Sequence, residues 1–147
     1  MAVFASPVAG YLLHFGADLG YRVILVEPSP DRVGDLEAYT VVSTVDPSFA
    51  DPDADVVVTD HDRPELGEML RAALATPARW IGVMGSTRHA AQHVPALREL
   101  GATDAEIARV HRPIGLNIGS KAPAEIAVST LAGLIASRNN RAGGFSF

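Results

Sequence analysis

The chain contains no cysteine, and this absence excludes several kinds of chemistry. Without thiols there are no disulfides, no thiolate nucleophile and no thiolate metal ligands. No apolar run approaches the roughly 20 residues that a membrane-spanning helix needs, and no segment resembles a signal peptide. We therefore expect a cytoplasmic protein.

Positive charge is also scarce, with 12 Lys and Arg against 17 Asp and Glu and a formal net charge of −5. The basic residues are scattered, so the sequence shows no cluster of Lys and Arg of the kind that binds nucleic acid. With 147 residues, 48% hydrophobic and 20% charged, the chain is long enough to bury a core without disulfide or metal support. We expect one domain over residues 1–138, followed by a polar, glycine-rich, flexible tail over 139–147.

The first 27 residues are typical of a βαβ unit. A short apolar strand, Ala2–Ala5, precedes a helix that Ser6 caps and that Pro7 begins. Gly20 ends this helix, and the apolar segment YRVILV (21–26) follows as a buried strand. The spacing places four apolar residues on the core face of the helix: Val8, Leu12, Phe15 and Leu19.

Glycine is missing from the first turn, where a dinucleotide-binding fold needs it. The pattern G-x-G-x-x-G lets backbone approach a pyrophosphate, but this turn reads FASPVA (4–9), with no glycine before Gly10. Ordinary NAD(P) or FAD binding is therefore disfavoured. Glu27, at the end of the second strand, occupies the place where such folds hold a ribose hydroxyl; the alternative is an ordinary surface acid.

Strands and helices alternate along the rest of the chain. The patterns predict a short helix over 30–39, an edge strand over 40–44, a strand over 55–59, a helix over 64–75 and a strand over 79–84. A capping box at Thr103–Glu106 predicts a short helix to about His111. The Pro- and Asp-rich segment 46–55 fits a solvated loop better than a metal site. This alternation predicts a Rossmann-like, doubly wound α/β domain with a mainly parallel sheet and helices on both faces.

Two loops after strands carry polar residues where ligands collect in such sheets. His61 and Asp62 follow one strand; His61 has the chemistry of a general base or metal ligand, and the alternative is a turn in which Asp62 caps the next helix. Gly85, Ser86 and Arg88 follow the next strand, and we expect them to lead into a helix whose first turn binds an anion. That helix would face inward with Ala90, Ala91, Val94 and Leu97. His89 and His93 have metal-ligand spacing, but without a third ligand they are better interpreted as exposed or capping residues.

The segment PIGLNIGSKAP (113–123) contains the only lysine of the chain, Lys121. Pro123 suits the first position of the helix that follows, and Ala122 is a poor cap, so the N–H groups of that helix start are left free for an anion. The alternative is a glycine-rich loop that only turns the chain into a packing helix. The predicted core stripe of this helix is Ala127, Val128, Leu131, Leu134 and Ile135.

Nearly the whole chain resembles the C-terminal domain of the XdhC/CoxI family, most specifically over 81–136. The resemblance is carried by DHD (60–62), WIGVMGSTR (80–88) and GATDAEIARVHRPIGLNIGSKAPAEIAVS (101–129). These family members are accessory proteins of molybdenum hydroxylases such as xanthine dehydrogenase. The resemblance implies a non-catalytic protein that binds molybdenum cofactor, helps its sulfuration and delivers it to the apo-enzyme. The candidate cofactor-binding residues are Ser6, Glu27, His61, Asp62, Gly85, Ser86, Arg88, Gly115, Asn117, Gly119, Ser120 and Lys121.

The sequence departs from the family in several places. The family's G-A-G turn is replaced by Phe4-Ala5-Ser6, its Asp by Asn117 and its Thr by Ala122, and a second Arg near Thr87 is missing. The family's N-terminal domain, often with a cysteine, is not in this sequence, so a separate chain is one expected partner beside the apo-enzyme and a cysteine desulfurase. A homodimer also stays open. Two other functions remain: a small NAD(P) oxidoreductase with His61 as base, and an interaction module with a degenerate pocket.

Overall fold

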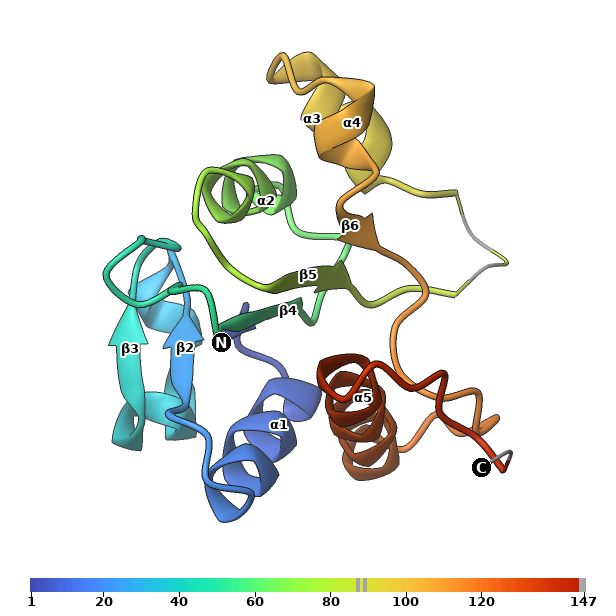
Figure 1. The fold of residues 1–147 in the computed structure, drawn as a ribbon. Helices are drawn as coiled ribbons and strands as arrows, with labels where there is room; N and C mark the ends of the chain where they lie inside the picture. The colour runs from blue at the N-terminus through green and yellow to red at the C-terminus, as the bar shows by residue number, and fades with distance from the viewer. Residues whose placement is uncertain (87, 89, 146–147) are drawn as a thin grey trace.

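The sheet is parallel throughout and has the strand order of a Rossmann fold. In the computed structural model, which describes residues 1–86, 88 and 90–145, six strands are hydrogen-bonded in the order β3-β2-β1-β4-β5-β6 (Figure 1). The strands are β1 (Ala2–Val3), β2 (Ile24–Val26), β3 (Thr40–Val42), β4 (Asp55–Val58), β5 (Trp80–Val83) and β6 (Val110–His111). The predicted Rossmann-like fold is confirmed.

Helices cover both faces of the sheet. Figure 1 shows α1 (Pro7–Asp18) and α5 (Pro123–Arg138) together on one face, and α2 (Leu66–Leu74), α3 (His93–Glu99) and α4 (Asp104–Ile107) on the other. Because both faces are covered, β2 and β4 are buried along their whole length. No helix in the described part of the chain is long and apolar enough to cross a membrane.

Local capping signals are confirmed by the structure. Ser6 Oγ accepts a hydrogen bond from the N–H of Ala9 at the start of α1. Gly20, at φ 83°, ends α1 in a Schellman motif, in which Tyr21 donates to the carbonyl of Gly16. Thr103 forms the predicted capping box of α4. Ala122 provides no side-chain cap for α5, as expected.

Three predicted helices have different bounds. Residues 30–39 form two 3₁₀ turns, η1 (Pro30–Arg32) and η2 (Gly34–Ala38), instead of one helix. The helix predicted to reach His111 ends at Ile107, and β6 then adds a parallel strand beside β5. The helix predicted after Gly85 begins only at His93. A two-residue strand such as β6 forms because the neighbouring strand supplies its hydrogen-bond partners. Two residues are too few to show the alternation of apolar and polar residues that predicts a strand.

The core faces of α1 and α5 are rotated from the predicted stripes, because the two helices pack on each other as well as on the sheet. Leu19 and Val128 were both predicted to face inward, but they are 54% and 56% exposed. The buried residues of α1 are instead Ala9, Leu12, Leu13 and Gly16, and those of α5 are Ala127, Ser129, Thr130, Leu131 and Leu134.

Candidate functional site

The strand order reverses between β1 and β4, and the crevice outside their carboxyl ends is where open α/β sheets bind ligands. Val3 is in register with Val26 on one side and with Val58 on the other. The residues that follow these strands, Phe4, Glu27 and Thr59, therefore begin three adjacent loops at the same edge. The predicted site is built from these loops and from those after β5 and β6.

The first of these loops turns tightly without a glycine. Phe4 has φ 73°, a left-handed conformation that favours glycine, and its side chain is fully buried. Ser6 Oγ donates to Thr59 Oγ1 at 2.9 Å and accepts from Ala9, so this hydroxyl is engaged within the turn. The loop that would hold a pyrophosphate in a dinucleotide fold is therefore closed by its own contacts.

Glu27 is not a surface acid, because only 2% of it is exposed. Arg63 donates two hydrogen bonds to its carboxylate, Nη1 to Oε2 at 3.0 Å and Nη2 to Oε1 at 2.9 Å. The backbone N–H groups of Ala5 and Ser29 each donate at 2.9 Å as well. Burial alone would raise the pKa of Glu27, but these four donors hold the pKa below its ordinary value. The carboxylate that would hold a ribose hydroxyl is thus satisfied inside the protein.

Arg63 was missed by sequence reasoning. Its guanidinium lies over the ring of Phe4, 4.5 Å from the centroid, and also bonds Glu65. The pair of Arg63 and Glu27 therefore bridges the end of β1 from its two neighbouring strands. The available signal was that Arg63 lies in the loop after β4. Only β1 separates the carboxyl end of β4 from that of β2, where Glu27 lies.

The loop after β4 forms a local turn in which Asp60 Oδ1 accepts from the N–H of Asp62. Asp62 does not cap α2, which begins at Leu66 without a side-chain cap, so that prediction is wrong. Instead Asp62 Oδ1 accepts from Gln92 Nε2 at 3.1 Å, which ties this loop to the start of α3. His61 is partly buried, and its Nε2 lies 3.8 Å from Asp62 Oδ1.

Gly85 and Ser86 lie against an arginine that follows β6. A Cβ on Gly85 would be 2.6 Å from Arg112 Nε, so glycine is needed for the guanidinium to cross the backbone here. Arg112 Nη2 donates to the carbonyl of Ser86 at 2.9 Å. Ser86 Oγ accepts from the N–H of Arg88, which is exposed and lies before α3. The prediction that these residues lead directly into the first turn of a helix is therefore wrong, because α3 begins only at His93. Their binding of an anion stays a prediction.

His93 is the second residue that sequence reasoning misjudged. It is only 6% exposed, where an exposed or capping residue was predicted, and its Nδ1 is buried without a hydrogen-bond partner. His89, its proposed metal partner, lies outside the described residues. Within the described residues no group of three His, Asp or Glu side chains is placed to hold a metal ion.

Replacing His93 with leucine is expected to make stability less sensitive to acid. Burial first, and then the charge of Arg112, lower the pKa of His93. Between the native pKa and the ordinary value near 6.5, the unfolded chain binds a proton that the native protein does not, so wild-type stability falls as the pH falls through this window. Urea unfolding at pH 5 and pH 7.5 should show a smaller acid loss for His93→Leu. The exposed His14 gives the control His14→Leu, and equal acid losses in all three proteins would contradict the prediction.

The segment from Gly115 to Lys121 contains both packing and accessible residues. Gly115, at φ 80°, lies against α5, where a Cβ would be 2.6 Å from Ser129 Oγ, so its close approach serves packing. Asn117, Gly119 and Lys121 are exposed, and Ser120 Oγ accepts from the N–H of Ala122. Among the described residues, no hydrogen bond or ion pair joins this turn to Gly85 or Ser86.

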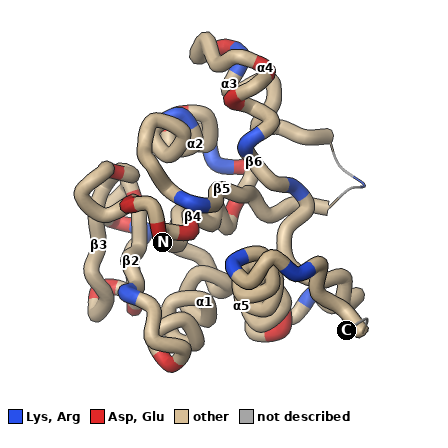
Figure 2. Tube along the Cα trace, in the orientation of Figure 1, with Lys and Arg blue, Asp and Glu red and all other residues tan. Residues whose placement is uncertain are grey.

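Figure 2 shows Lys and Arg interspersed with Asp and Glu along the part of the trace that is coloured. The parallel sheet, its strand order and the polar loops at its switch point define a Rossmann-like α/β domain. Residues 1–134 match the model of the XdhC Rossmann domain, so the chain belongs to the XdhC family. The resemblance stated from the sequence is confirmed.

One known protein and one solved structure illustrate what this chain is similar to. The protein YqeB of Escherichia coli K12, described as uncharacterized, is 32% identical over 128 residues, which are 87% of this chain and 23% of YqeB. A Bacillus halodurans structure described as a xanthine dehydrogenase matches with a TM-score of 0.70 at 23% identity, over 99% of this chain and 46% of that one. The chain therefore spans less than half the length of either relative. The structural match shows the fold alone.

Proposed function

We propose that this domain is an accessory, non-catalytic part of molybdenum hydroxylase maturation. It would bind molybdenum cofactor as cargo, or the phosphate-bearing pterin part of it, and aid insertion into the apo-enzyme. Membership of the XdhC family is the observation that carries this proposal, since the family is one of accessory proteins for enzymes such as xanthine dehydrogenase.

The loops after β4 and β5 and the turn before α5 are the proposed binding surface. Gly85 and Gly119 would let backbone approach the cargo, and Ser86 and Ser120 would donate hydrogen bonds. Arg88 and Lys121, both exposed, would neutralise the phosphate. His61 and Asp62 would line the same edge. Asn117 and Gly115 belong to the same segment, although Gly115 faces α5.

The contacts of Glu27 and Ser6 argue against a dinucleotide enzyme. Ser6 is engaged inside the first turn by Thr59 and Ala9. Glu27, at the end of β2, is held by Arg63, so binding a ribose would require breaking the bidentate bonds of Arg63. A ligand whose anionic group is held beside β5 and α5 does not need that turn. The same closed turn favours the second candidate, a docking module for the apo-enzyme, for a cysteine desulfurase or for a separate N-terminal-type domain.

Arg88→Ala and Lys121→Ala should each weaken binding of isolated molybdenum cofactor by about tenfold, which corresponds to about 1.4 kcal/mol, since each removes one cation from a phosphate contact. The measurement is an anaerobic titration followed by the intrinsic fluorescence of the pterin.

The matched control is Arg98→Ala, because Arg98 is also an exposed arginine but pairs with Asp104, the first residue of α4. Its affinity should equal that of the wild type. Unchanged affinity in both Arg88→Ala and Lys121→Ala would reject this binding surface. Wild-type protein that captures the apo-enzyme without binding cofactor would favour the docking module.

A further inference from the structure

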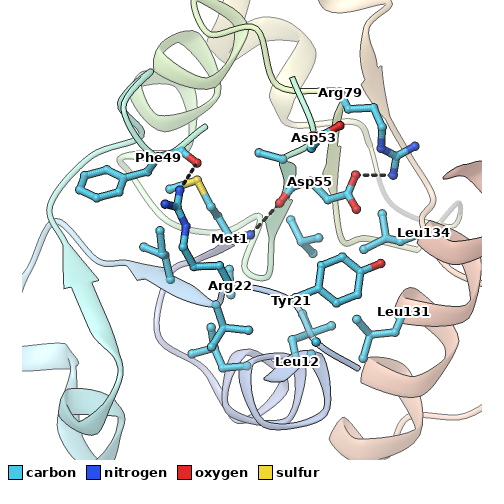
Figure 3. A pocket seen from close by; sticks show the side chains of 18 of the residues that line it. Met1, Leu12, Tyr21, Arg22, Phe49, Asp53, Asp55, Arg79, Leu131 and Leu134 are labelled. Carbon is cyan, nitrogen blue, oxygen red and sulfur yellow. Dashed lines mark hydrogen bonds and ion pairs between the residues drawn. The ribbon is translucent and has the colours of Figure 1, made fainter. Parts of the chain in front are cut away.

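A cavity of about 390 Å³ lies at the amino ends of the strands, on the edge opposite the loops described above (Figure 3). Small residues leave this space open: Ala2 of β1, Gly16 and Gly20 at the end of α1, and Ala54 just before β4. Protein interiors contain few voids larger than a water molecule, so an unfilled space of this size is unusual. Ligands of Rossmann folds bind at the carboxyl ends of strands, so this cavity is separate from the proposed cofactor surface.

The floor of the cavity is apolar. Figure 3 shows Leu12 of α1 and Leu131 and Leu134 of α5 facing the same space. These three side chains are each at most 7% exposed, and Val57 of β4 completes the surface. A hydrocarbon body placed here would leave water and meet only apolar neighbours, which is favourable.

The ring of Tyr21 forms a wall beside these leucines (Figure 3). Arg138 Nη1 donates to Tyr21 Oη at 3.2 Å, and the guanidinium of Arg138 also lies 5.4 Å from the centroid of the ring. The phenol oxygen therefore has its partner within the protein, and the wall is in place before any ligand arrives. Small-molecule sites are usually preformed in this way and have volumes in the range found here.

The ionic side chains around the cavity already have partners. They are three arginines and three aspartates: Arg22, Arg79, Arg138, Asp51, Asp53 and Asp55. Arg79 Nη2 pairs with Asp55, and the charge of Arg138 also acts on Asp55. Arg22 donates to a backbone carbonyl at 3.3 Å, and the carboxylate of Asp51 accepts a backbone N–H at 3.0 Å. Since the two signs are balanced, the lining favours neither an anion nor a cation, and a charged ligand would lose water without gaining a counter-charge.

We propose that this cavity binds a small neutral molecule whose body is mainly hydrocarbon and has the size of one or two rings. An apolar cavity of about 150 Å³ is enough to bind benzene, so the larger space here has room for such a molecule. Its body lies on Leu12, Leu131 and Leu134, beside the ring of Tyr21. This second site does not depend on the proposed cofactor function.

The test is a calorimetric titration with indole, indole-3-acetate and tryptamine, which share one ring system and carry no charge, a negative charge and a positive charge at pH 7.5. Indole should bind saturably with one site per chain. Neither charged analogue should bind more tightly than indole, because the arginines and aspartates of the lining compensate one another. These measurements on the wild-type protein need no variant.

Two cavity-filling variants locate the bound indole. Leu134→Phe narrows the cavity from α5, Leu12→Phe narrows it from α1, and each should weaken indole at least tenfold. The matched control is Val128→Phe, which enlarges an exposed side chain of α5 outside this cavity and should bind indole as the wild type does. Because the two variants alter different helices, either one that folds is sufficient.

Three results would overturn the proposal. The first is the absence of saturable indole binding to the wild-type protein. The second is tighter binding of indole-3-acetate or tryptamine than of indole, which would show that the site selects a charge. The third is full affinity for indole in a folded Leu134→Phe or Leu12→Phe variant, which would place the bound indole elsewhere.

Discussion

Replacing Arg63 with methionine should lower the free energy of unfolding by about 3–5 kcal/mol, a fall of roughly 10 °C in Tm for a domain of this size. The change removes two of the four donors to Glu27 and leaves a buried carboxylate without its counter-charge. It also removes the guanidinium that lies over Phe4. Urea unfolding at pH 7.5 measures the loss directly.

The matched control is Arg98→Met, since Arg98 forms an ion pair with Asp104 in which both side chains are mostly exposed. Exposed pairs contribute about 0–1 kcal/mol, so the control should change little. A loss in Arg63→Met no larger than in Arg98→Met would contradict a structural role for the buried pair.

The same pair makes a pH prediction. The native pKa of Glu27 is lowered, so its stabilising contribution is complete above the ordinary carboxyl pKa near 4.5 and is lost as the pH falls through the native value. Arg63→Met removes most of the stabilisation that the ionised carboxylate of Glu27 provides. The difference in stability between wild type and Arg63→Met should therefore shrink as the pH is lowered below about 4.5. A constant difference between pH 7 and pH 3 would show that Glu27 is not the group concerned.

Gly115→Ala should cost about 3 kcal/mol. The new Cβ would lie 2.6 Å from Ser129 Oγ and 3.1 Å from the backbone nitrogen of Thr130, at a φ of 80°. Relief would require moving α5 or breaking the hydrogen bond from Ser129 to the carbonyl of Leu116. Thermal and urea unfolding of the purified variant measure the cost.

Gly119→Ala separates strain from packing. Gly119 also has positive φ, 69°, but a Cβ there meets nothing within 4 Å. The only remaining cost is that of holding an alanine in the left-handed backbone conformation, about 1 kcal/mol of stability. Equal losses in the two variants would mean that the contact of Gly115 with α5 does not hold the turn in place.

Signals within a few residues predicted the fold well. Ser6, Gly20 and the Thr103 capping box identified helix ends, because a cap depends on neighbours three or four residues away. Buried strands such as β4 were visible as short apolar runs. From the alternation of strands and helices, the parallel Rossmann-like sheet followed.

The candidate site was harder to predict because its contacts join distant residues. Nothing near Glu27 in the sequence indicates that Arg63, 36 residues later, satisfies it. His93 was misjudged because its burial depends on where α3 begins, and that start lies beyond the loop that follows Gly85. The two-residue strand β6 carries no pattern of its own, and without it the place of Arg112 beside Gly85 was hidden.

The most direct test of the account is a thermal-shift comparison of the purified protein with anaerobic molybdenum cofactor, NADH and NADPH. A one-site ligand at 100 times its Kd adds about 2.7 kcal/mol, which is several degrees in Tm. We expect a rise with molybdenum cofactor and none with either nicotinamide nucleotide, because Arg63 holds the carboxylate of Glu27 and Ser6 is bonded to Thr59. A rise with NADH or NADPH and none with molybdenum cofactor would contradict it.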